Sequence, residues 1–444
     1  MDTKKRINDF FPSYQKDLKS LISKESVLDE EGEKPFGKGI QEALEEILEI
    51  ADRLGFETKI DPEGYYGYAE IGEGEDLFGV LGHMDVVPVG NLDSWNTNPF
   101  ELTEKDGKLY GRGTSDDKGP MLASMYSLKA ILDAGYELNQ RVRFIIGTDE
   151  ESLWRCMDAY TAKEEIPSMG FTPDSGFPLN YAEKGLIEYY LYANEESSIR
   201  LEGGGPLNAV PEEARVDYDE DVEAALNELD YTYEKDANDL VVYGKAMHAM
   251  VADQGKNAIV YAAQALHKAG KRNAMIDFIV DVLADPNGRG IYGEVEDEVS
   301  GKLMLNVGNV SFSESEQKVG IDMRFPVTTE KDFIDETLKN VGKEHGIRVE
   351  DYDYLPSVYI ERDSDLVKGL MDAYQKITGD MVSQPKVSGG ATYARAMDNI
   401  VAYGALLPGK EETEHQANEN LVIEDMKIAM EVYIEAFMNL VVSK

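Results

Sequence analysis

Histidine and carboxylate side chains recur at the ends of apolar segments in this sequence, where they could bind metal ions. His83 and Asp85 close the apolar run 77–85. Because side chains alternate between the two faces of a strand, these two residues point to the same side of a sheet. One of them can then ligate a metal while the other orients it. A histidine that only packs in a core leaves the same pattern, so the pair gains weight only from similar residues downstream.

The downstream candidates share a position at the edge of an apolar or glycine-rich segment: Asp116, Glu150, Glu151, Asp174 and His415. Histidine and carboxylate ligands without cysteine suit zinc, manganese or cobalt in a hydrolytic site. Two ions about 3.5–4 Å apart need a bridging carboxylate and about two terminal ligands each, which this set can supply. Adjacent Glu150 and Glu151 point in different directions, so one could bind metal while the other transfers protons. The alternative for this acidic stretch is a solvated loop.

The segments around these residues alternate between predicted helices and strands. Apolar residues at helical spacing predict helices at 7–21 and 39–54, and a third helix that is opened by 117–120, with Pro120 in its first turn, and closed by Gly135. Apolar runs predict buried strands at 77–81 and 141–146. This alternation predicts an α/β sheet flanked by helices. Sites in such sheets gather at the carboxyl ends of strands, where His83 and Glu150 fall.

The pattern changes in the middle of the chain. Beyond about residue 179 the sequence is richer in strand-like segments, such as 187–192 and 303–307, with a helix at 258–268. The α/β pattern returns near residue 356 and ends in an amphipathic helix at 423–440. We therefore predict a catalytic domain formed by 1–178 and 356–444, with 179–355 inserted as an α+β domain.

Composition restricts the partners of the protein. There are 86 acidic and 44 basic residues, a formal charge of −42, which repels nucleic acid and anionic membranes. Cys156 is the only cysteine, which excludes an intrachain disulfide and suits a reducing compartment. The first 26 residues are charged throughout, and no apolar run reaches the length of a membrane span. A soluble cytoplasmic protein is expected.

Longer motifs connect the candidate residues to a known family. The segment 82–88 (Gly-His-Met-Asp-Val-Val-Pro) and the segment 109–119 (Leu-Tyr-Gly-Arg-Gly-Thr-Ser-Asp-Asp-Lys-Gly), with Trp95 between them, resemble the aminoacylase/carboxypeptidase-type dinuclear metallopeptidases. Glu150-Glu151, Pro173-Asp174 and His415 follow in the same order. The likeness covers nearly the whole chain and is greatest to the bacterial dipeptidase V group, which cleaves dipeptides including carnosine-like Xaa-His.

This resemblance implies a role for each candidate metal ligand. His83 and Asp174 would bind one ion, Glu151 and His415 the other, and Asp116 would bridge both. The two divalent ions would be zinc first, with manganese or cobalt as alternatives.

The resemblance also implies the residues that act around the ions. Asp85 would hydrogen-bond His83 and fix its tautomer. Glu150 would be the general base, taking a proton from the attacking water and passing it to the leaving amine. In the family the peptide bond after the bridging residue is usually cis, which here is Asp116–Asp117.

The inserted domain is expected to act as a lid that contacts the substrate. His248 resembles the histidine that polarises the scissile carbonyl, and Arg324 the arginine that holds the substrate carboxylate. Asn208 would add a polar contact, and Gly389 and Gly390 would let backbone N–H groups approach the carboxylate. A long lid of this group serves its own chain, so a monomer is expected. Taken alone, Arg324 could instead be a surface cation paired with a neighbouring aspartate.

The sequence thus predicts a metal-dependent dipeptidase acting on short peptides, including Xaa-His or β-alanyl dipeptides. Alternatives with the same metal site are an N-acyl-amino-acid deacylase, a desuccinylase or an aminotripeptidase. A noncatalytic metal-binding protein is the alternative of another class, and the presence of Glu150 with every expected ligand argues against it.

Overall fold

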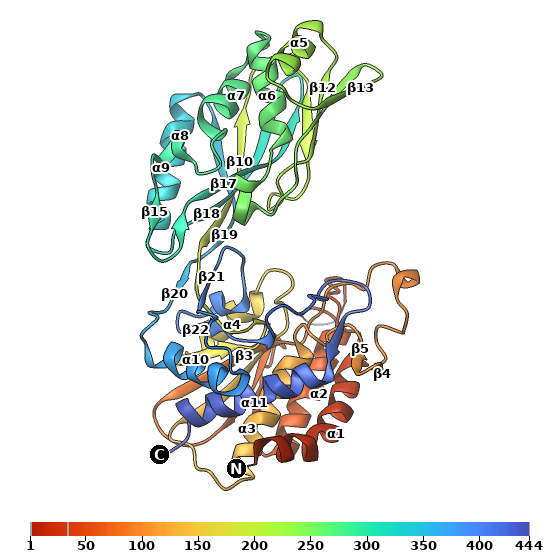
Figure 1. The fold of residues 1–444 in the computed structure, drawn as a ribbon, viewed down its shortest axis with the longest axis vertical. Coiled ribbons are helices and arrows are strands. Elements are labelled where there is room, and N and C mark those ends of the chain that lie inside the picture. The colour runs from red at the N-terminus through yellow and green to blue at the C-terminus, as the bar shows by residue number, and fades with distance from the viewer. Residues whose placement is uncertain (1, 33–34, 444) are drawn as a thin grey trace. The chain divides into compact units, whose positions relative to one another are not determined.

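The chain forms two compact units (Figure 1). The computed structural model describes residues 2–32 and 35–443. The first unit comprises Met1–Tyr181, Tyr359–Lys386 and Thr392–Lys444, and the second comprises Ala182–Val358 with Val387–Ala391. The chain therefore passes between the units four times. The division into two units does not test the function of the second unit, so its role as a lid stays a prediction.

A mixed sheet forms the centre of the first unit. Its strands run in the order β1-β2-β6-β3-β7-β22. β3 pairs in parallel with β6 and β7, β7 pairs in parallel with β22, and β1, β2 and β6 pair antiparallel. The bounds are β1 (Glu57–Ile60), β2 (Tyr66–Ile71), β3 (Leu77–His83), β6 (Arg141–Gly147), β7 (Met169–Thr172) and β22 (Ile400–Ala402). β9 (Asn180–Glu183), β20 (Val358–Tyr359) and β21 (Lys386–Ser388) lie where the chain crosses between units.

Helices cover both faces of this sheet. Phe437 of the last helix packs against Phe78 and Phe144 on one face, with ring centroids 6.2 and 6.4 Å apart. On the other face, Leu81 and Ile145 share a buried cluster that includes residues of α4. A strand buried on both faces needs apolar residues at every position, which explains the unbroken run of β3. The helices are α1 (Thr3–Ile22), α2 (Lys38–Leu54), α3 (Lys118–Leu132), α4 (Arg155–Lys163), α10 (Asp365–Thr378) and α11 (Ile423–Leu440).

Helix ends follow the local signals in the sequence. Gly55 ends α2 in the left-handed region, with φ 97°, where glycine carries no steric penalty. The predicted helices at 39–54 and 423–440 correspond to α2 and α11, the predicted helix opened by 117–120 corresponds to α3, and the predicted strands at 77–81 and 141–146 correspond to β3 and β6. These expectations are confirmed, because strong periodicity is what determines which face of an element is buried.

Small sheets at the edge of the first unit shape the loops near the strand ends. β5 pairs antiparallel with β24, which aligns Tyr110 with Asn420. The strands of these sheets are β4 (Thr103–Lys105), β5 (Lys108–Tyr110), β24 (Asn420–Val422), β8 (Ser175–Gly176) and β23 (Ala405–Leu406). The first unit also contains two short 3-10 helices, η1 (Leu92–Ser94) and η4 (Tyr393–Ala396). The β5–β24 pair joins two segments about three hundred residues apart in the chain.

The second unit is built on an eight-stranded antiparallel sheet. Its order is β13-β14-β12-β11-β17-β18-β10-β19. The bounds are β10 (Gly185–Ala193), β11 (Leu201–Gly204), β12 (Glu213–Asp217), β13 (Tyr233–Asp236), β14 (Asp239–Tyr243), β17 (Met304–Phe312), β18 (Gln317–Phe325) and β19 (Arg348–Leu355), with a separate hairpin of β15 (Glu296–Asp297) and β16 (Gly301–Lys302). The helical segments are α5 (Glu220–Glu228), η2 (Ala249–Gln254), α6 (Ala258–Lys268), α7 (Ala274–Phe278), η3 (Ile279–Leu283), α8 (Arg289–Tyr292) and α9 (Lys331–Glu344).

The two faces of this sheet differ in character. Ile187, Tyr189 and Leu191 of β10 enter a core that also includes residues of α6. On the other face, Glu188, Tyr190 and Tyr192 are only partly buried. Among the described residues, no helix combines the length and the apolar character needed to cross a bilayer.

Candidate metal centre

His83 is the last residue of β3 and is fully buried. Its Nδ1 atom lies 2.9 Å from the backbone oxygen of Asp85 and 3.5 Å from the Oδ1 atom of the same residue. The nearer acceptor is therefore the carbonyl of Asp85 rather than the carboxylate that the sequence suggested. With its Nδ1 proton donated to Asp85, the imidazole would keep a lone pair on Nε2, the form in which it binds metals.

Asp116 lies between the two histidines. Its Oδ1 atom is 2.9 Å from Nε2 of His83, and its Oδ2 atom is 2.9 Å from Nε2 of His415. The Asp116–Asp117 peptide bond is cis, as the motif led us to expect. One carboxylate with an oxygen facing each imidazole is the geometry of a bridging ligand.

Two further carboxylates complete the cluster. The Oδ2 atom of Asp174 lies 3.7 Å from Nε2 of His83, and the Oε2 atom of Glu151 lies 3.1 Å from Nε2 of His415. The ligand atoms form two sets, each within 4.8 Å: His83, Asp116 and Asp174, and Asp116, Glu151 and His415. The two candidate metal sites share Asp116, and all five residues belong to the first unit.

The electrostatics of this cluster are dominated by carboxylates. Burial, followed by the charge of Asp116, raises the pKa of Asp174 to about 8. Burial is also the largest cause of the raised pKa values of Glu150 and Glu151. Hydrogen bonds to Asp116 and Glu151 raise the pKa of His415 to about 10. The negative charges outnumber the two imidazoles, and divalent cations stabilise such a set.

The donor set fits two divalent ions. It contains imidazole nitrogens and carboxylate oxygens and no thiolate, as in zinc, manganese or cobalt sites. The Oε1 atom of Glu151 is buried without a hydrogen-bond partner among the described residues. A buried carboxylate oxygen left unpaired is costly, and a cation bound beside His415 is a suitable partner for it.

Glu150 lies on the turn that follows β6, next to Glu151. The charges of His83 and Asp174 act on its carboxyl group, which places it beside the first candidate site. Its backbone oxygen accepts a hydrogen bond from Nε1 of Trp154 at 2.7 Å. Glu150 belongs to neither ligand set.

Comparison with known proteins identifies the family. Residues 79–439 match peptidase family M20/M25/M40. The chain belongs to this family. The expectation of an enzyme of the metallopeptidase class is thereby confirmed.

Two relatives of this M20 peptidase resemble it along their whole length. "Putative dipeptidase YtjP" of Bacillus subtilis strain 168 is 34% identical over 455 residues, which cover 96% of each protein. "Putative dipeptidase MW1694" of Staphylococcus aureus strain MW2 is 33% identical over 471 residues, covering 99% of this chain and 100% of the relative.

A solved structure shows the same fold. The M20 family metallo-carboxypeptidase Sso-CP2 from Sulfolobus solfataricus aligns over 96% of this chain and 98% of its own, with a TM-score of 0.59 and 19% identity. The predicted fold class, a mixed sheet flanked by helices with an inserted α+β domain, is confirmed, and the second domain is built on an antiparallel sheet.

The second unit of the M20 peptidase gathers the residues that the sequence assigned to substrate contacts. Arg324 is buried, and its Nε and Nη2 atoms donate to the carboxylate of Asp322 at 2.8 and 2.6 Å. Its Nη1 atom donates to the backbone oxygen of Gly389 at 3.1 Å. Arg324 is thus paired with Asp322, but the pair is buried and does not lie on the surface. Gly390 follows Gly389, with its N–H 3.0 Å from the Ser388 hydroxyl.

His248 and Asn208 are neighbours on another edge of the second unit. The Nδ1 atom of His248 accepts a hydrogen bond from the N–H of Met250 at 3.1 Å. Burial and the charge of Arg324 lower the pKa of His248. The neutral ring therefore carries its proton on Nε2, where it can be donated. The backbone oxygen of Asn208 accepts the N–H of Ala249 at 2.8 Å, so both side chains lie at one exposed edge.

Sequence reasoning missed two residues that support the centre. The Oδ2 atom of Asp117 accepts the backbone N–H of His83 at 3.2 Å. Glu419 is fully buried and accepts several hydrogen bonds from the segment before Asp116. In the sequence, Glu419 stands two residues before the apolar pair Leu421 and Val422. This pattern indicates that the residue could be buried, but it does not indicate which groups the carboxylate contacts.

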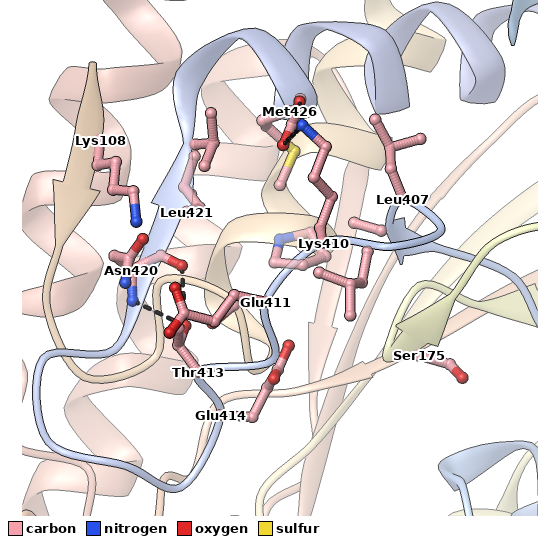
Figure 2. Close-up of a pocket in the computed structure, with 16 residues that line it drawn as sticks. Lys108, Ser175, Leu407, Lys410, Glu411, Thr413, Glu414, Asn420, Leu421 and Met426 are labelled. Carbon is pink, nitrogen blue, oxygen red and sulfur yellow. Dashed lines mark hydrogen bonds and ion pairs between the residues drawn. The ribbon is translucent and has the colours of Figure 1, made fainter. Parts of the chain in front are cut away.

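A cavity of about 220 Å³ in the first unit borders the segments that carry the ligands (Figure 2). Its lining includes Ser115, Ser175 and Glu414, which are next in sequence to Asp116, Asp174 and His415. Its apolar part includes Leu407, Leu421 and Met426, which are labelled in the view. The segments that carry three of the ligands therefore also line this cavity.

Proposed function

We propose that this M20 peptidase is a dipeptidase that hydrolyses the peptide bond of short peptides with the help of two divalent metal ions. The observation that carries the proposal is the position of Asp116, with one oxygen 2.9 Å from His83 Nε2 and the other 2.9 Å from His415 Nε2. Its two relatives described above bear dipeptidase names, which supports the substrate class.

In this proposal the five clustered side chains hold the ions. His83 and Asp174 bind one, Glu151 and His415 bind the other, and Asp116 contacts both. When bound, such ions polarise a carbonyl oxygen and lower the pKa of water so that it attacks at neutral pH. Zinc is our first choice, with manganese and cobalt as alternatives, because ligands of this type discriminate weakly between them.

Glu150 moves the proton during hydrolysis. As a general base, its carboxylate accepts a proton from the water that attacks the scissile carbonyl carbon. It then gives this proton to the nitrogen of the leaving amine, and the C–N bond breaks. Its position beside the ligand set, yet outside it, supports this division of labour with Glu151.

The second unit supplies the contacts that recognise the substrate and acts as a lid. The Nε2–H of His248 donates to the scissile carbonyl oxygen as negative charge develops on it. Arg324, with its plane fixed by Asp322, holds the terminal carboxylate of the substrate. Asn208 adds a further polar contact, and Gly389 and Gly390 let backbone N–H groups approach that carboxylate.

The resemblance of the motifs extends the proposal to the finer class. We place the enzyme nearest to the dipeptidase V group, with Xaa-His and β-alanyl dipeptides among its substrates. A cytoplasmic location and a monomeric state belong to the same proposal.

Hydrolysis of a small substrate panel tests the function. The purified enzyme is stripped with a chelator and assayed with zinc, manganese or cobalt on a dipeptide, a β-alanyl dipeptide, a tripeptide and an N-acetyl amino acid. We expect metal-restored cleavage confined to the dipeptides. Cleavage of the acetylated substrate alone would make the protein a deacylase, and cleavage of the tripeptide alone an aminotripeptidase. Inactivity with every metal would contradict the proposal.

A further inference from the structure

The carboxylate of Glu419 accepts hydrogen bonds from several backbone N–H groups of the segment that leads to Asp116. It accepts the N–H groups of Gly113 at 3.1 Å, Ser115 at 2.9 Å and Asp116 at 3.2 Å. The hydroxyl of Ser115 donates to it at 3.2 Å, and Nη1 of Arg112 at 2.7 Å. Glu419 itself is fully buried, so its carboxylate depends on donors from the protein rather than from bulk water.

Such an arrangement fixes the backbone around Asp116. Several N–H groups that converge on one acceptor cannot rotate away without leaving a buried donor unpaired. Gly113 has φ 88°, a conformation that suits glycine and turns the chain back towards the carboxylate. The N–H of Gly111 donates to the backbone oxygen of Glu419 at 3.1 Å, which closes the contact from the other side.

Arg112 extends the contact to the segment that follows His83. Its Nη1 atom pairs with Glu419, while Nη2 donates to the backbone oxygen of Pro88 at 3.4 Å. Its guanidinium also lies over the ring of Trp95, 5.3 Å from the centroid. Glu419 stands four residues after His415 in the sequence. The Arg112–Glu419 pair therefore joins the three segments that carry His83, Asp116 and His415.

We propose that Glu419 is a positioning residue that holds Asp116 at the place where its two carboxylate oxygens face both histidines. Arg112 acts with it by neutralising its charge and by connecting it to the segment after His83. Glu419 belongs to neither candidate ligand set, and in this proposal it acts only through Asp116 and its neighbours. The inference rests on the proposed role of Asp116 as the shared metal ligand.

Glu419→Gln tests this role with little change in volume. The amide places an NH₂ group against N–H donors and keeps only one accepting oxygen. We expect zinc and manganese to bind the variant about 10- to 100-fold more weakly, as is typical when a partner of a ligand is lost. Titration calorimetry of the metal-free protein measures this. The visible spectrum of the cobalt-loaded protein should also change, because it reports ligand geometry.

Asp17→Asn is a matched control in the same unit. Asp17 is a buried carboxylate of α1 that accepts hydrogen bonds from Arg53 and from Tyr126, away from the ligand segments. We expect it to lower the melting temperature while metal affinity and the cobalt spectrum stay as in the wild type. Equal effects of both variants on metal affinity would mean that Glu419 contributes only general stability, and the inference would fail.

A milder variant keeps the test decisive if Glu419→Gln does not fold. Ser115→Ala removes one hydroxyl donor to Glu419 and leaves its backbone contacts in place. We expect a few-fold loss of metal affinity, and wild-type affinity in this variant would overturn the inference. A wild-type protein that binds no metal would refute the proposed function itself. If the wild-type protein binds metal and the variants bind it with the same affinity, only the role of Glu419 is refuted.

Discussion

The carboxylate of Asp85 accepts a hydrogen bond from the backbone N–H of Glu151, with the two atoms 2.9 Å apart. Asp85 follows β3 and Glu151 follows β6, so this bond connects the ends of two neighbouring parallel strands. The backbone oxygen of Asp85 lies 2.9 Å from Nδ1 of His83. One residue therefore orients an imidazole and the peptide plane between Glu150 and Glu151. Of the two glutamates, Glu151 faces His415, with its Oε2 atom 3.1 Å from Nε2 of the histidine.

Glu150→Gln should separate catalysis from metal binding. Because Glu150 lies outside both ligand sets, the variant should keep its metal content, measured by inductively coupled plasma spectrometry. Loss of a general base should lower kcat about 10²- to 10⁴-fold. Asp116→Asn is the contrasting variant, and it should lose both metal and activity. Near-normal turnover of Glu150→Gln would show that another group takes the proton.

His248→Ala should reduce kcat by about 10²- to 10³-fold, the usual effect of removing one donor to a developing oxyanion. The pKa of His248 is lowered by burial and by Arg324. The neutral, Nε2-protonated ring therefore stays the main form as the pH rises through 7, and its contribution to kcat should persist there. Steady-state kinetics at pH 6 to 9 measures this. An unchanged kcat with a raised KM alone would assign the residue to binding rather than to catalysis.

Arg324→Lys should weaken recognition of the substrate carboxylate. Lysine keeps the charge but lacks the planar fork that both Asp322 and a carboxylate engage. Charge-assisted hydrogen bonds of this kind contribute about 1.5–3 kcal/mol, so KM for a dipeptide should rise roughly 10- to 100-fold. A dipeptide amide, which has no terminal carboxylate, serves as the control and should be affected little. Equal losses on both substrates would contradict the assigned contact.

Glu188 should make the stability of the second unit depend on pH. It faces Asp322 on β18 and Asp353 on β19, with Arg324 nearby, and burial followed by these carboxylates raises its pKa to about 7. A carboxyl group with a raised pKa in the folded state stabilises fully below its unfolded value of about 4.5. That stabilisation is lost as the pH rises through 7.

Glu188→Gln should therefore stabilise the second unit relative to the wild type above pH 7 and have a smaller effect near pH 5. We expect about 1 kcal/mol, because solvent screens this partly exposed group. Hydrogen exchange of β10 and β18 at pH 5 and pH 8 measures the difference. The exposed Glu298→Gln variant is the control. A benefit that is equal at both pH values would argue against ionisation of Glu188 as the cause.

The sequence pattern indicates some of the candidate ligand positions, because His83 ends a buried strand and Glu151 follows another, whereas Asp116 and His415 lie in loops and are assigned only from the resemblance of the motifs. β3 and β6 are recognisable as buried strands, and parallel strands bring their carboxyl ends to one edge. The role of Glu419 could not be predicted, since it depends on the pairing of β24 with β5 across the chain. The acidic surroundings of Glu188 could not be predicted for the same reason, because the register between β10 and β18 determines that Asp322 lies opposite it.

The short segment 387–391 limits how the second unit can be exchanged between proteins. It is separated in sequence from the rest of that unit, yet it supplies the carbonyl of Gly389 that Arg324 contacts. A fragment cut out as 182–358 would lack this acceptor. Chimeras that exchange the second unit between relatives should therefore transplant both pieces of chain together, because each piece supplies one partner of the contact between Arg324 and Gly389.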